Sequence, residues 1–171
     1  MANEIKLQVG TIISWKVSGG DETIDIGDST TSLADGVEVG AYHDWGVDPR
    51  PNRYMWFLDI DGFVATNSPV IGETVDLYVT ESEDSTLWTG PEAPGDTTRG
   101  AGNTDRLKNL RYLGSAVVRS TTEADNLTAS GEVTINSRYF APVVHNNTAD
   151  PLLISADSHE VRFYPISDEI Q

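Results

Sequence analysis

Apolar and polar residues alternate along much of the chain with a period of two, which is the pattern of β-strands that bury one face. The first such segment covers residues 5–17, where most odd positions are apolar and most even positions are polar. This is long for one strand. Either the segment bends at Gly10 into two strands, or its start, residues 1–9, is an extended arm that reaches a neighbouring molecule.

Shorter alternating segments follow, separated by turn sequences rich in glycine, proline, asparagine and aspartate. Asp61 and Gly62 form a tight-turn pair, so we expect a hairpin that joins the strands on either side of them. Pro142 lacks a backbone N–H, which indicates a sheet edge or a bulge, and an open edge there could pair with another subunit. The further strands that we expect lie in or near residues 23–26, 37–42, 54–60, 63–65, 73–80, 112–118, 133–143 and 159–163.

One segment, residues 81–104, has neither helical nor strand periodicity. Loops of this length in compact domains are uncommon and are usually functional or disordered. We interpret this one as a contact loop around Trp88, with simple disorder as the alternative. The leucines that follow are spaced three apart and permit one short helical turn, the only helix that the sequence predicts: Leu107, Leu110 and Leu113.

These patterns predict an all-β fold, an antiparallel β-sandwich or jelly roll with long loops and little helix. No internal repeat or shift in composition divides the chain, so we expect a single domain over residues 1–171. A domain of this size buries about 70% of its unfolded surface and needs no covalent staple. The absence of cysteine excludes disulfides and thiolate metal sites.

Charge narrows the range of partners. The 27 acidic and 11 basic residues give a net charge of −16, which repels nucleic acid and anionic membranes, and the basic residues are scattered. The sequence has no apolar run long enough for a membrane span, and its first residues lack the apolar run of a secretory signal. We therefore expect an unexported protein that binds neither nucleic acid nor membrane.

The sequence offers no specific catalytic or metal-binding motif. Residues 59–62 begin like a calcium loop, but Phe63 and Val70 occupy positions where that loop needs ligands. Pairs of carboxylates, as in glycoside hydrolases, are too easily found among 27 acids to be informative. The three histidines share no metal-binding spacing, and packed or rim positions are expected for them: His43, His145 and His159. We predict no enzyme, no catalytic residue, no cofactor and no bound metal.

Aromatic residues are the candidates for binding, and three tryptophans stand out: Trp45, Trp56 and Trp88. If Met55 and Phe57 face the core, Trp56 faces outward, where a row of aromatic rings could stack on sugars or anchor a protein interface. The alternative is a sheet with both faces partly covered.

The last third of the chain resembles the C-terminal end of small structural proteins of tailed bacteriophages. The resemblance rests on GEVTINSRYFAPVVHNN at residues 131–147 and HEVRFYPISDEIQ at residues 159–171, with LKNLRYLGSAVV at residues 107–118 similar in style. Among such proteins the capsid decoration, or cement, class fits best.

This resemblance implies a non-enzymatic virion protein, made in the bacterial host cytoplasm and placed on the outer capsid surface. Its partners would be the major capsid protein and sister subunits, with a homotrimer favoured. We expect contacts in the N-terminal segment, including Ile5 and Leu7, and in the loop around Trp88. The alternatives are a head-completion or tail protein, and a carbohydrate-binding or adhesion module.

Overall fold

The computed structural model describes residues 5–24, 26, 36–46, 50–64, 68–90, 94–95, 97–99, 104–122, 126–153 and 159–170. Within these ranges the chain forms β-strands and one short 3₁₀ helix, η1 (Thr104–Leu107). No helix among these residues is long and apolar enough to cross a lipid bilayer.

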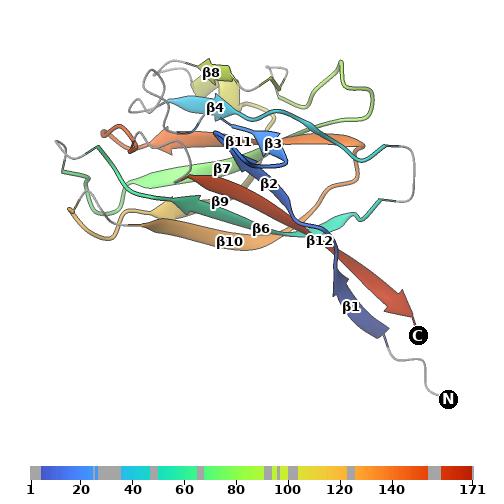
Figure 1. Ribbon diagram of the computed structural model, residues 1–171. Helices are drawn as coiled ribbons and strands as arrows, with labels where there is room; N and C mark the ends of the chain where they lie inside the picture. The colour runs from blue at the N-terminus through green and yellow to red at the C-terminus, as the bar shows by residue number, and fades with distance from the viewer. Residues whose placement is uncertain are drawn as a thin grey trace.

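Two sheets form the body of the molecule (Figure 1). The first sheet contains, in spatial order, β10 (Leu127–Thr134), β6 (Arg53–Ile60), β12 (Glu160–Ile170), β2 (Ile13–Lys16) and β3 (Glu22–Thr23), with β1 (Ile5–Val9) beside β12. The second contains β8 (Thr97–Arg99), β4 (Val37–Val39), β11 (Tyr139–Asn147), β7 (Thr74–Ser82) and β9 (Arg111–Val117), with β5 (His43–Asp44) beside β11. The strand pairs are antiparallel except β2 with β3. The predicted all-β sandwich is confirmed.

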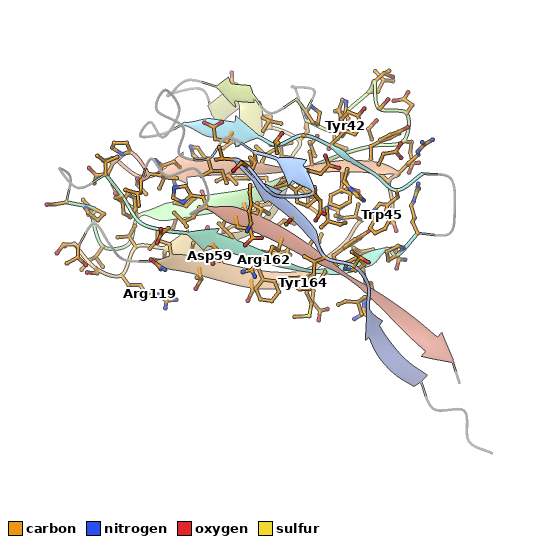
Figure 2. All side chains as sticks on the ribbon, in the orientation of Figure 1. Tyr42, Trp45, Asp59, Arg119, Arg162 and Tyr164 are labelled. Atoms are coloured by element: carbon orange, nitrogen blue, oxygen red, sulfur yellow. The ribbon has the colours of Figure 1, made fainter. Side chains whose placement is uncertain are left out.

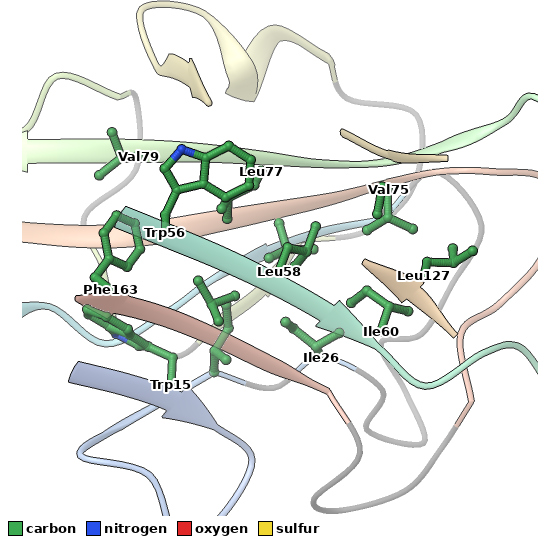
Figure 3. Close-up of a cluster of buried hydrophobic side chains, with 14 of the residues drawn as sticks. Trp15, Ile26, Trp56, Leu58, Ile60, Val75, Leu77, Val79, Leu127 and Phe163 are labelled. Carbon is green, nitrogen blue, oxygen red and sulfur yellow. The ribbon is translucent and has the colours of Figure 1, made fainter. Parts of the chain in front are cut away.

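The core lies between the two sheets, where alternate side chains from each sheet meet (Figure 3). Trp15, Phe140 and Phe163 form an aromatic group at its centre, with ring centroids 5.3–5.6 Å apart. The Trp15 indole N–H donates to the carbonyl of Ala41 at 2.8 Å, so this buried polar group is satisfied. Burial of these large rings supplies much of the apolar contact that holds the sheets together.

The expectation that Trp56 faces solvent is wrong. In β6 the even positions face the core and Trp56 is only 3% exposed, whereas Met55 is 38% exposed on the outer face. Asp59 lies in phase with Met55 and Phe57, because side chains alternate along a strand. Asp59 is therefore the residue in the sequence that indicates which face of β6 is exposed, since an aspartate on the core face would need a buried partner.

Pro142 does not mark a sheet edge, because β11 lies between β7 on one side and β4 and β5 on the other. The Pro142 carbonyl accepts a hydrogen bond from the Gly40 N–H at 3.0 Å. The carbonyl and the N–H of one residue in a strand point to the same side, so the N–H that proline lacks would also face residues 40–42. These residues separate β4 from β5, so the N–H that proline lacks lies where the strand pairing on that side of β11 is interrupted. The suggested pairing of another subunit through this strand is therefore excluded.

The predicted hairpin around Asp61 and Gly62 is also wrong. Phe63 forms an isolated bridge with Leu152, and the Leu153 N–H donates to the Gly62 carbonyl at 3.0 Å. The neighbour of β6 is β10 on one side and β12 on the other, so no room remains for a hairpin partner. A local turn signal cannot show that both neighbouring positions are already occupied by distant strands.

The first segment breaks into β1 and β2, as the glycine at position 10 suggested. The Gly10 N–H donates to the Pro165 carbonyl at 2.8 Å, and beyond this point β1 pairs with the end of β12. Figure 1 shows these two strands extending away from the sandwich, with the start of β1 and the end of β12 at the tip. We call this pair of strands, β1 with residues 166–170, the ribbon.

Residues 81–104 are more ordered in their described part than the sequence indicates. Strand β7 continues to Ser82, β8 forms an edge of the second sheet, and η1 begins at Thr104. The short helical turn comes earlier than expected, since Leu110 follows η1 and Leu113 lies in β9. Part of the supposed loop therefore belongs to the sheet and the helix.

Candidate binding surface

One end of the sandwich brings together segments that are far apart in the sequence. Here Arg50, just before β6, donates to the Glu83 carboxylate, just after β7, at 3.2 Å and to the Asn136 carbonyl at 2.6 Å. The ribbon leaves from the same end, because Ile166 pairs with Arg53 at the start of β6. We call this the ribbon end of the molecule.

The turn that follows β7, residues 83–90, is fixed by its own hydrogen bonds. The Asp84 carboxylate accepts from the backbone N–H groups of Thr86 and Leu87, both at 2.9 Å. These bonds stabilise the ionised form and lower the pKa of Asp84 to about 2. The Ser82 hydroxyl accepts from the Ser85 N–H at 3.1 Å. Serine, aspartate and threonine favour such local bonds, which is why these residues turn instead of continuing the strand.

This turn presents two large side chains. Leu87 is 78% exposed, the highest value among the exposed large apolar side chains of the described residues. The Trp88 indole N–H donates to the Ser85 carbonyl at 3.2 Å, which fixes the ring while leaving it partly exposed. A depression of about 330 Å³ lies beside Leu87 and is lined in part by Glu83 and Ser137.

Trp88 belongs to a group of partly exposed rings from three segments, Tyr42, Trp88 and Tyr139. The ring centroid of Tyr42 is 5.8 Å from that of Trp88 and 5.5 Å from that of Tyr139. The Arg138 guanidinium lies 4.7 Å from the Tyr139 ring centroid, within the range of a cation–π contact. We call these three rings with Leu87 the aromatic surface.

Arg138 is itself held in place. Its guanidinium donates two hydrogen bonds to the Asp44 carboxylate, at 2.7 and 2.8 Å. The same bonds hold the pKa of Asp44 below its ordinary value, and a third comes from the Gly46 N–H at 2.7 Å. A bidentate pair of this kind orients the arginine plane against the ring, so the aromatic surface is preorganised.

Trp45 lies at the same end but is half-buried. Its ring packs against His43 and Tyr54, with centroid distances of 4.9 and 6.1 Å. It also lines a depression of about 140 Å³ together with Ile12, which is 42% exposed. Figure 2 shows Tyr42 and Trp45 at this end of the sandwich.

The structure thus places Trp45, Trp88 and the β1 segment with Ile5 and Leu7 at one end, and Trp56 in the core. Only the backbone of Ile5 and Leu7 is described, so their side chains lie outside the described residues. Sequence reasoning missed Leu87, Arg138 and Tyr139. An apolar residue beside Trp88 in a segment without periodicity was the available signal for Leu87; Arg138 and Tyr139 carried none.

The arrangement offers aromatic faces, an exposed leucine and fixed charges, which are the contact groups of a docking surface. In the part of the chain that the structure describes, no group of three or more histidine or acidic residues is placed to hold a metal ion. These features define a β-sandwich protein with a candidate binding surface at one end.

Comparisons with known proteins give only a weak structural likeness. No protein-family model matches the sequence, and no curated protein does. Among solved structures, the crystal structure of murine APRIL at pH 5.0 is similar with a TM-score of 0.40 and 8% identity, over 96% of this chain and 99% of that chain.

Proposed function

We propose that the protein is a non-enzymatic virion structural protein that binds the outer surface of a phage capsid and stabilises it by bridging major capsid protein subunits. The observation that carries the proposal is the ribbon end, where a projecting pair of strands and the aromatic surface lie together. The resemblance of the last third of the chain to structural proteins of tailed phages is the reason for proposing the major capsid protein as the partner.

The ribbon has the properties of a bridging element. Among the described strands, β1 pairs only with β12, and residues 167–170 pair only with β1. Two strands alone are marginally stable in water, and each outer edge leaves backbone donors and acceptors open. Addition of a strand from a neighbouring molecule would satisfy those groups.

The aromatic surface supplies side-chain anchors for the same contact. Interface energy is concentrated in a few side chains, most often tryptophan, tyrosine and arginine. Trp88 and Arg138 are both fixed by hydrogen bonds, so little conformational entropy is lost when a partner binds them. Leu87, beside a depression, is the most exposed apolar side chain of this surface, so its burial by a partner would add apolar contact area.

On a capsid lattice, several modest contacts act together and bind more strongly than each would alone. Each copy that touches two capsid subunits gains a second contact at high effective concentration. Following the resemblance, we propose a homotrimer as the bound form, made in the host cytoplasm and placed on the outer capsid surface. Sedimentation equilibrium of the purified protein should return three times the monomer mass.

The main test is co-sedimentation of the purified protein with mature capsids that lack it, with bound copies counted against the major capsid protein. Saturation at a lattice-like ratio is the expected result. A few copies per particle would instead favour a head-completion or tail role, and absence of binding would contradict the proposal.

A matched pair of variants tests the binding end. Leu87→Ser removes the exposed leucine at the ribbon end, whereas Ile71→Ser removes an apolar side chain that is 62% exposed before the start of β7, at the opposite end of that strand. We expect Leu87→Ser to weaken capsid binding by about tenfold, as the loss of an interface anchor does, and Ile71→Ser to leave it unchanged. Equal effects would place the contact elsewhere.

The second candidate is a carbohydrate-binding or adhesion module, which the three partly exposed rings of the aromatic surface favour, since aromatic faces stack on sugars. Quenching of Trp88 fluorescence by neutral oligosaccharides would support it. The Trp88→Phe variant should then lose the quenching while keeping its fold.

A further inference from the structure

A second site lies on the outer face of the first sheet, away from the aromatic surface. A hollow of about 460 Å³ opens there, and its lining includes Phe57, Asp59, Arg119, Thr128, Ser130 and Arg162. Figure 2 shows Asp59 and Arg162 along this face with Arg119 beside them.

The strand register explains how these side chains meet. Ser130 and Arg162 pair with Phe57 from the two sides of β6, which places the three in one row across β10, β6 and β12. Thr128 and Glu160 pair with Asp59 in the next row on the same face. Residues directly opposite each other share a face of the sheet. The short side chains on β10 leave the hollow, and Arg119, from the loop after β9, borders it.

The two arginines retain donors for a ligand. Arg162 lies 5.7 Å from the Phe57 ring centroid, with ion pairs of 3.7 Å to Asp59 and 3.5 Å to Glu160. These distances are longer than those of a tight charged hydrogen bond, and the side chain is 31% exposed. Arg119 is exposed and has no ion pair with any residue that the structure describes.

The charge of the lining identifies the ligand class. The lining itself holds two arginines and one aspartate, a charge of +1, and Glu160 lies just outside it beside Arg162, in a chain of net charge −16. A dianionic phosphate would be repelled by Asp59 and by the neighbouring Glu160. A single carboxylate would accept hydrogen bonds from the arginines with less repulsion than a dianion, Asp59, Thr128 and Ser130 would bond hydroxyl groups, and the Phe57 ring would offer an apolar face.

We propose that this hollow binds an acidic saccharide, a pyranose ring that carries one carboxylate. Its volume lies within the range of about 300–1,000 Å³ that is usual for small-ligand sites. The proposal is independent of the proposed capsid contact, because the hollow lies on the face of the first sheet and the aromatic surface lies at the ribbon end.

The test is titration of the full chain with a glucuronate-terminated disaccharide, followed by two-dimensional amide NMR. We expect saturable shifts of the Thr128 and Ser130 amides, and about tenfold weaker binding of the matched glucose-terminated disaccharide, since a charged hydrogen bond is lost. Inorganic phosphate should not compete. Equal binding of the neutral sugar, competition by phosphate, or no shift at these amides would overturn the assignment.

Two variants and a control locate the site. Arg119→Gln removes an exposed guanidinium and should weaken the acidic disaccharide about tenfold with an unchanged unfolding midpoint. Ser130→Leu should fill the hollow and abolish binding. Lys108→Gln removes the same charge from an exposed side chain outside the hollow and should have no effect. All three should still bind capsids if the proposed function holds, so the two proposals fail separately.

Discussion

At the scale of single residues, Trp56 and the two glycines beside it determine how closely neighbouring strands pack. The Trp56 ring lies against Gly114 of β9 and Gly131 of β10, one glycine from each sheet. A Cβ at Gly114 would lie 2.6 Å from the ring, and one at Gly131 would lie 2.7 Å from it. Both positions therefore need glycine for close approach, although neither requires a positive φ.

Gly131→Ala should destabilise the protein by about 1–3 kcal/mol, because overpacking forces a rigid ring to move. Urea unfolding followed by circular dichroism measures this change. Gly95→Ala is the control, since nothing lies within 4 Å of the added Cβ there, and its effect should stay within about 0.5 kcal/mol. Equal stability of the two variants would contradict the packing described for Trp56.

A second residue-scale feature is the buried His159. The Asp61 N–H donates to its Nδ1 at 3.1 Å, so Nε2 carries the proton and donates to the Leu153 carbonyl at 2.6 Å. Burial lowers the pKa of His159 below the ordinary 6.5, and a proton on Nδ1 would also face the Asp61 donor. The histidine is therefore packed and neutral, which confirms the expectation for this residue.

Stability should depend on pH through His159. The unfolded chain binds a proton at this histidine below 6.5 and the folded chain does not, so folding is favoured above 6.5 and that contribution is lost as the pH falls towards the lower folded pKa. Urea unfolding of the wild type should show this decrease, and His159→Gln should have a smaller slope over the same range. Identical slopes would contradict the assignment of the effect to His159.

At the scale of elements, the turn at residues 83–90 is a rigid support for the aromatic surface. Its order comes from a carboxylate and hydroxyls that bond backbone groups within the turn, and not from burial of apolar residues. Such a turn can lose its order without unfolding the sandwich, because local openings cost less than global unfolding.

Asp84→Ala should release this turn. Hydrogen exchange at the Thr86 and Leu87 amides should become faster, since both lose their acceptor, while exchange in the core strands stays unchanged. In the wild type the folded pKa of about 2 lies below the ordinary 3.8, so the ionised carboxylate favours the turn above 3.8 and the contribution is lost as the pH falls through about 2.

Asp84→Asn is the conservative counterpart. Its amide oxygen can still accept a hydrogen bond but does not titrate, so most of the protection should remain without the acid transition. An acid transition retained in this variant would show that another group controls the turn.

At the scale of the whole molecule, the ribbon and the sandwich are separable parts. The buried core that the structure describes starts at Ile13, and β1 makes its backbone pairs only with residues 166–170 of β12 in the described part of the chain. We therefore expect the two sheets to pack without β1.

Deletion of residues 1–9 should leave the unfolding midpoint nearly unchanged and abolish or strongly weaken capsid binding. Calorimetry and co-sedimentation measure the two effects on the same sample. If the truncated protein binds capsids as well as the full chain does, the ribbon is not the bridging element. If it fails to fold, β1 contributes to the sandwich itself.

The sequence predicted the class of the fold and parts of the candidate surface. Alternation predicts the strands, Gly10 predicts the break between β1 and β2, and the aromatic residues of the loop-rich segments include Trp45 and Trp88 at the ribbon end. Alternation alone could not show which face of β6 is buried, because both faces of this strand carry large apolar residues.

What the sequence by itself determined is the strand periodicity, the position of a bend and the net charge of the chain. The tertiary structure alone decided which face of β6 is buried, why Pro142 is tolerated in a central strand, and how Tyr42, Trp88 and Tyr139 meet. The physical reason is that a strand carries its own alternation, whereas its buried face and its neighbours are set by hydrogen bonding and packing with strands that lie far away in the chain.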